Sequence, residues 1–170
     1  MEYFARKISI AKWKQESSAN PDDIRADAIT GCLRTKEDTL SFWLCTQDRT
    51  DVAEVALALA SKMEQAETIH IVLVCRNDLD TDGLEIRITA PDIPVADLKE
   101  RHRDLVNLNM IKLCCVARNV AKRVRQDNAH YLFSKTTVLD ILKSAIDLGR
   151  LDISKLSEKM RQKVLSHNMK

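Results

Sequence analysis

Glycine is scarce in this chain of 170 residues, which contains only Gly31, Gly83 and Gly149. No two of them lie close enough to form a P-loop or the G-x-G-x-x-G turn of a dinucleotide-binding fold. The sequence therefore excludes nucleotide chemistry that depends on the familiar glycine-rich loops. Phosphate sites of a less recognisable design stay open.

Cysteine occurs five times, at Cys32, Cys45, Cys75, Cys114 and Cys115. No two of these residues form a C-x-x-C pair. An odd number without this pair fits neither a disulfide framework nor a zinc site, so we expect reduced, buried thiols. Residues 1–7 lack an apolar signal region, and no run approaches the roughly 18 apolar residues of a membrane helix. We therefore expect a cytoplasmic protein with no membrane contact and no bound cofactor.

Charge is divided between the two halves of the chain. Residues 1–93 contain 11 Lys and Arg against 17 Asp and Glu, a net charge of −6. Residues 94–170 contain 16 against 8, a net charge of +8. A basic half of this kind predicts an acidic protein or nucleic-acid partner.

The first half has the hydropathy pattern of an α+β region. Capping and amphipathic patterns indicate one helix that starts at Pro21 and ends by Gly31, and a second that starts at Asp51. Alternating or continuous apolar runs indicate strands at residues 3–13, 32–35, 39–46, 69–74 and 84–88. We expect a small mixed sheet with two helices, in the order β-α-β-β-α-β-β, and a strand at 69–74 that is buried on both faces.

Pro91 and Pro94 mark a change of pattern, because proline ends strand pairing and disfavours helix in the residue before it. Beyond them the apolar spacing is helical, with helices predicted at residues 106–124, 137–148 and 154–165. Gly149 is placed to cap the second of these helices. The predicted organisation is an acidic α+β lobe over residues 1–93, followed by a basic, all-helical lobe over residues 94–170.

The first helix of this second lobe carries a seam of apolar residues with a spacing of 4, 3, 4, 3 and 4, at Val106, Met110, Leu113, Ala117, Val120 and Val124. Heptad spacing is typical of a helix that packs on a partner helix, so we predict a partner seam. The seam is shorter than an independent coiled coil. Additional apolar residues at Ile111, Cys114, Cys115 and Val116 favour a mostly buried helix as the alternative.

Basic side chains are spaced along two predicted helices and suggest contact with phosphate or with an acidic partner protein. They are Arg118, Lys122, Arg123, Arg125, Lys155, Lys159 and Lys163. Ordinary solvated helix faces have the same appearance and are the alternative. The last two helices fit a helix-turn-helix that presents lysines to DNA, although their connection is slightly long and a plain helical hairpin also fits.

An acidic segment resembles the start of a calcium loop, in which alternate carboxylates bind one cation, here Asp78, Asp80 and Asp82. The twelfth position is Thr89 rather than glutamate and strands are predicted on both sides, so an acidic hairpin turn is the alternative. Glu85 and Arg87 also suggest the D…E-x-K pattern of metal-dependent nucleases, with arginine in place of lysine.

The N-terminal region resembles a known group of proteins through residues 2–8, Lys12, Trp13 and the segments 26–29, 33–35 and 38–43. It is similar to the small middle components of bacterial anti-phage systems built around an SMC-like ATPase, of the Lamassu type. The resemblance covers mainly residues 2–60. It implies a kleisin-like or adaptor subunit that holds the ATPase and a nuclease effector together and has no catalysis of its own.

Three hypotheses follow from these patterns. The first is a non-catalytic adaptor of a larger complex, in which the acidic lobe binds one partner and the basic helical lobe binds another. The second is a DNA-binding regulator that uses the C-terminal helices. The third is a metal-dependent nuclease.

Overall fold

A computed structural model of the chain describes residues 2–13 and 24–167. These residues form a six-stranded antiparallel sheet in the order β4-β5-β2-β1-β3-β6. The strands are β1 (Tyr3–Ile8), β2 (Leu40–Cys45), β3 (Ile69–Cys75), β4 (Glu85–Ile88), β5 (His102–Val106) and β6 (His130–Phe133). The α-helices are α1 (Ile10–Trp13), α2 (Ala26–Cys32), α3 (Arg49–Ala60), α4 (Arg76–Thr81), α5 (Met110–Val124), α6 (Lys135–Asp147) and α7 (Glu158–Leu165), with short 3₁₀ segments η2 (Ala96–Arg101) and η3 (Ile153–Lys155).

The longest strand pair of the sheet is β1 with β3, which align over six positions. Successive residues of a strand point to opposite faces, and β3 is apolar on both. Ile71 and Leu73 belong to the core on one face, whereas Val72 and Val74 belong to the core on the other. The predicted strand at residues 69–74, buried on both faces, is confirmed.

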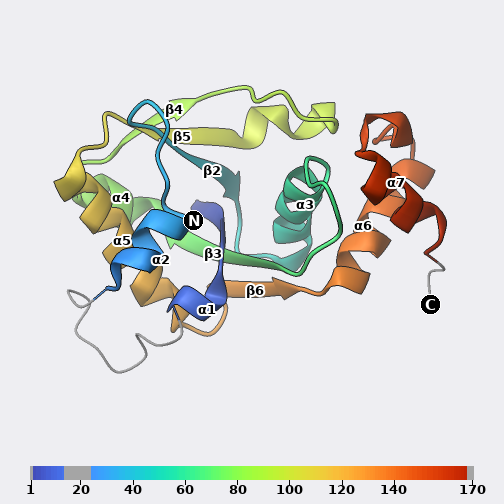
Figure 1. The fold of residues 1–170 in the computed structure, drawn as a ribbon. Helices are drawn as coiled ribbons and strands as arrows, with labels where there is room; N and C mark the ends of the chain where they lie inside the picture. Colours follow the sequence, from blue (N-terminus) through green and yellow to red (C-terminus); the bar gives the residue numbers. More distant parts are fainter. Residues whose placement is uncertain (1, 14–23, 168–170) are drawn as a thin grey trace.

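Helices cover both faces of the sheet, which gives three layers. One core lies between the sheet and α3, α6 and α7, and the other between the sheet and α1, α2, α4 and α5. Figure 1 shows α3, α6 and α7 on the right of the molecule and α2, α4 and α5 on the left. The molecule is therefore a mixed α and β structure, as expected, but its sheet is antiparallel and not the mixed sheet that was predicted.

The division into two lobes is not confirmed. Residues 94–170 were expected to be all helical, but they contain β5 and β6. β5 lies between β4 and β2, which both come from the first half of the chain, and β6 forms the opposite edge. The two halves thus share one sheet.

Several element boundaries differ from the prediction. Residues 32–35 are not a strand, so the expected hairpin is reduced to one bridge between Lys36 and Thr39. The second helix starts earlier than Asp51, because Asp48 accepts hydrogen bonds from the backbone N–H groups of Thr50 and Asp51. The helix start predicted at Pro21 lies outside the described residues, where α2 is described from Ala26.

The acidic segment is helical over residues 78–81 and does not form the expected calcium loop or hairpin turn. It belongs to α4, whose last turn is closed by Gly83 at a φ of 64°. The backbone N–H of Leu84 bonds to the carbonyl of Leu79, and that of Gly83 bonds to the carbonyl of Asp80. This is a Schellman cap, in which the left-handed residue favours glycine. Gly149 closes α6 in the same way, with a φ of 70°, as predicted.

Replacing Gly149 with alanine should lower the free energy of unfolding by about 1 kcal/mol, because a side chain at positive φ is strained. Gly31→Ala is the matched control, since Gly31 lies inside α2 and has no positive φ. Its new methyl group would meet only the flexible end of Lys12. Urea denaturation of both variants checks this, and an equal loss in the two would contradict the assignment of Gly149.

Candidate functional site

Acidic side chains of the first half are paired with basic side chains of the second half. The pairs are Asp51 with Arg101, Glu54 with Arg150, Asp78 with Lys122 and Arg123, and Glu85 with Lys112. The uneven charge of the two halves is therefore used in part within the molecule. Only the charges that are not paired within the molecule are available to attract an outside partner.

The three carboxylates of the calcium-loop pattern point to different partners. Asp78 binds the cations of α5, and Asp82 accepts a hydrogen bond of 2.7 Å from Asn119. Asp80 lies 3.4 Å from Arg76 of its own helix. Residues two apart on a helix lie about 200° apart around its axis, so these side chains do not converge. Within residues 2–13 and 24–167, no cluster of three or more His, Cys, Asp or Glu side chains has the arrangement of a metal site.

The predicted partner seam faces the sheet of its own chain. Helix α5 is where the spacing placed it, but Val106 belongs to β5 and is buried there. Ala117 and Val120 are fully buried in the second core, and Leu113 and Val124 pack against it. Heptad spacing identifies a buried helix face, but it does not reveal whether that face meets another chain. Met110, at 71% exposure, is the seam residue left open to solvent.

The basic residues of α5 have different surroundings. Arg123 is only 15% exposed and lies 2.7 Å from Asp78, so it connects α5 to α4. Lys122 approaches the same carboxylate at 3.6 Å with more than half of its side chain exposed. Arg118 and Arg125 are exposed. The four residues therefore do not form one uniform phosphate-binding face.

Three lysines on or next to the C-terminal helix are on the surface. Lys155, Lys159 and Lys163 are exposed, while Met160 and Val164 pack into the core from the opposite side of α7. Residues 148–157, including η3, separate α6 from α7. That connection is much longer than the three or four residues of a helix-turn-helix, which favours the helical hairpin.

An apolar groove lies between α2 and the start of α5. It has a volume of about 520 Å³ and is lined by Ala26, Ile29, Thr30, Leu33, Arg34, Thr35, Met110 and Leu113. We call it the α2–α5 groove. Met110 is 71% exposed, and Ile111, the next residue of α5 but not part of the lining, is 76% exposed. Large apolar side chains gathered at an open groove are typical of a binding surface.

The local sequence explains why these side chains are exposed. Asn109 caps α5 by accepting a hydrogen bond of 2.9 Å from the backbone N–H of Lys112. Met110 and Ile111 are thus the first residues of the helix, before the turn where it packs on the sheet. Of the two, Met110 shares the lining of the groove with residues of the short helix α2.

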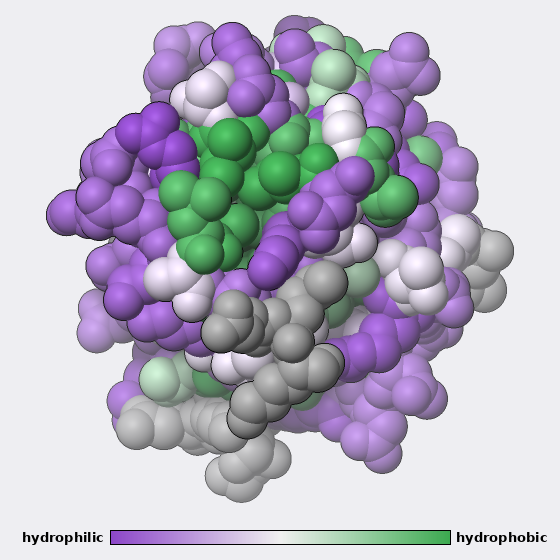
Figure 2. Space-filling model, turned by 90° about the vertical axis from the view of Figure 1, so that its right-hand side faces the viewer, coloured by the Kyte–Doolittle hydropathy of each residue, from purple (hydrophilic) through white to green (hydrophobic). Residues whose placement is uncertain are grey.

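A second apolar area lies on the other side of the molecule. Figure 2 looks onto the side that carries α6 and α7 and shows apolar side chains bordered by hydrophilic ones. Among the residues of this side, Leu148 and Leu165 are each 70% exposed. Ile141, Ile146 and Ile153 are partly buried against the core beneath.

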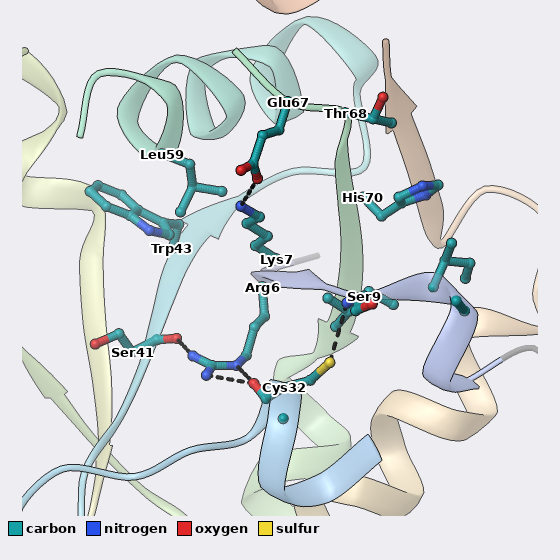
Figure 3. A pocket seen from close by; sticks show the side chains of 14 residues that line it. Arg6, Lys7, Ser9, Cys32, Ser41, Trp43, Leu59, Glu67, Thr68 and His70 are labelled. Carbon is teal, nitrogen blue, oxygen red and sulfur yellow. Dashed lines mark hydrogen bonds and ion pairs between the residues drawn. The ribbon is translucent and has the colours of Figure 1, made fainter. Parts of the chain in front are cut away.

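A larger pocket occurs where β1 and β2 separate. The two strands pair only from Tyr3 opposite Cys45 to Ala5 opposite Trp43. Beyond this point they diverge, and Figure 3 shows the space between them. We call this space, of about 670 Å³, the β1–β2 opening; its lining includes Arg6, Lys7, Cys32, Ser41, Trp43, Leu59 and Glu67.

Arg6 crosses the opening and bonds to backbone on both sides. Its Nη1 donates to the carbonyl of Ser41, and its Nε and Nη2 donate to the carbonyl of Cys32 at 2.9 and 2.7 Å. Burial lowers the pKa of Arg6 to about 10, partly offset by the charges of Cys32 and Asp104, so the side chain is a cation at neutral pH. The sequence around Arg6, one basic residue in an alternating strand, does not reveal that its side chain bonds to the backbone of two other segments.

Polar groups on β5 lie close to the opening. His102 contacts Trp43 edge to face, with 4.9 Å between ring centroids, and its Nδ1 lies 2.6 Å from the hydroxyl of Thr89. Burial lowers the pKa of His102, against the opposing charge of Asp104. The Oδ1 atom of Asp104 is buried and has no hydrogen-bond partner among the described residues.

Comparison of the chain with known protein families, with curated proteins and with solved structures gives no match. The resemblance to the middle components of SMC-type defence systems therefore stays a prediction. Across the described part of the chain, no helix combines the length and the apolar character needed to cross a membrane.

The assignment of Arg123 to the fold predicts a measurable difference from Lys122. Arg123→Ala should lower the free energy of unfolding by about 2 kcal/mol, because it removes a hydrogen-bonded, mostly buried partner of Asp78. Lys122→Ala should change it by less than about 0.5 kcal/mol, as for other exposed ion pairs. Thermal and urea denaturation measure both, and equal values would disprove the distinction.

Proposed function

We propose that this protein is a non-catalytic adaptor subunit of a larger complex and that the α2–α5 groove binds a helix of a partner protein. The observation that carries the proposal is the exposure of Met110 in the lining of this apolar groove, with the exposed Ile111 next to it in α5. A soluble protein gains nothing in stability from leaving two neighbouring large apolar side chains in water, whereas a partner that covers them does. Methionine also suits such a surface because its flexible side chain adapts to different contacts.

The surroundings of the groove favour an acidic, amphipathic helix as its occupant. The floor is apolar, and Arg34 lies on its lining. Grooves of this kind bind the apolar face of a helix, and basic residues around them select acidic flanks. The resemblance in the N-terminal region makes an SMC-like ATPase and a nuclease subunit the first partners to test.

The double variant Met110→Glu with Ile111→Glu should release the partner. In extracts of the source organism, the tagged wild-type protein should elute in an assembly well above its own 19.3 kDa, and the variant should elute as the free protein. With the partner identified and purified, the variant should bind at least about tenfold more weakly, as expected when central apolar contacts are lost.

Leu165→Glu is the matched control, because Leu165 is equally exposed but lies on α7. It should retain the assembly and the wild-type affinity. Thermal denaturation should show that all variants remain folded, since the altered side chains are on the surface. A wild-type protein that elutes alone, or a groove variant that still binds its purified partner normally, would disprove the proposal.

A DNA-binding function is the second candidate, and it is favoured by one observation. Lys155 lines a pocket of about 560 Å³ together with Lys62 and Lys99. The exposed Lys159 and Lys163 come after it in the chain, on α7. Such a cluster attracts phosphate groups. If DNA binds there, changing Lys155, Lys159 and Lys163 to glutamate should abolish a salt-sensitive mobility shift, whereas Lys36→Glu should leave it intact. A shift that is unchanged by the triple substitution would eliminate this candidate.

A further inference from the structure

The β1–β2 opening exposes backbone groups of two strands inside the sheet. The backbone N–H of Arg76, the first residue after β3, donates a hydrogen bond to the carbonyl of Glu2. Backbone groups point to alternate sides along a strand, so every second residue of β1, starting from Glu2, turns its backbone groups to β3. The residues between them, including Lys7, turn their backbone groups to β2. Ser41 faces β1 in the same way, two residues before Trp43. If the ladder continued, Lys7 would pair with Ser41. Because the strands separate, their backbone groups border the opening.

Arg6 brings a cation into this opening without a carboxylate to bind it. The guanidinium has five N–H groups, of which three donate to the carbonyls of Ser41 and Cys32. The other two form no hydrogen bond with any described residue. The nearby carboxylate of Asp104 acts on Arg6 only through its charge, since no hydrogen bond joins them. A partly buried cation whose hydrogen bonds go only to neutral carbonyls attracts an anion with planar geometry.

The rest of the opening suits a short stretch of extended chain. Trp43 and Leu59 form an apolar wall, and Figure 3 shows them on one side of Lys7. Lys7 and Glu67 form an ion pair of 3.5 Å at the rim, where both side chains are partly exposed. The volume of about 670 Å³ lies within the range of ordinary ligand sites. Backbone edges, an apolar wall and a cation are together the elements that recognise the end of a peptide.

We propose that the β1–β2 opening binds the carboxyl-terminal end of an extended peptide from a partner protein. Its carboxylate bonds to the free N–H groups of Arg6, its backbone bonds to Lys7 and Ser41, and its last apolar side chain packs on Trp43 and Leu59. This site is separate from the α2–α5 groove. It can exist whether or not that groove binds a helix.

The test uses the purified full chain and two pools of decapeptides with randomised last four residues. One pool ends in a free carboxyl group and the other in an amide. Peptides retained by the protein are identified by mass spectrometry, and their affinities are measured one by one through tryptophan fluorescence. The free-acid peptides should bind at least about tenfold more tightly than the same sequences as amides, because charge-assisted hydrogen bonds are lost in the amide.

Two variants connect binding to the opening. Arg6→Gln should abolish the preference for the free acid, and circular dichroism should establish that it is folded. Ser41→Phe keeps Arg6 and its carbonyl partners but fills the opening, so it should weaken binding at least tenfold, whereas Ser154→Phe at an exposed position elsewhere should not. Ser41→Phe decides the result if Arg6→Gln fails to fold.

Several results would overturn the proposal. These are the absence of retained peptides at millimolar concentration, equal binding of acids and amides, and unchanged affinity in Ser41→Phe. Acetate that competes as strongly as the best peptide would show that the opening recognises a carboxylate alone, which also overturns it. None of these results bears on the α2–α5 groove, whose variants test a different surface.

Discussion

The strand β3 has to bury apolar side chains on both of its faces, and the other elements follow from this requirement. Ile71 and Leu73 need cover on one side, and Val72 and Val74 need it on the other. One layer of helices cannot supply both. The chain therefore places α3, α6 and α7 on one face and α1, α2, α4 and α5 on the other, with the remaining strands added outward from β1 and β3.

Ionic contacts then join the layers that burial brings together. Arg123 holds α5 to α4 through Asp78, and Arg150 holds the end of α6 to α3 through Glu54. Both contacts connect a basic residue of the second half with an acidic residue of the first. The unequal charge of the halves thus reflects, in part, how the two halves fit each other. Only charges that lack such a contact, such as those of the α7 lysines, are available to an outside partner.

Predictions from the sequence succeeded where a pattern was long and its cause was local. The apolar run of β3, the helix α5 and the cap at Gly149 are of this kind. β5 and β6 were missed because each has five residues or fewer, and their pairing depends on strands far away in the chain. Alternate aspartates in α4 fit a loop or a helix equally well, so spacing alone could not decide. The β1–β2 opening was not predictable, since it results from the way two strands diverge in space.

The position of β5 between β4 and β2 has a consequence for the order in which the protein can form. Both neighbours are made before β5 when the chain is synthesised from its N-terminus. Until residues 102–106 leave the ribosome, the outer edge of β2 has no strand beside it, and β4 has nothing to pair with. The gap between β2 and β4 is therefore filled late in synthesis, and until then β2 has an open strand edge, the kind of surface on which chaperones and aggregation compete.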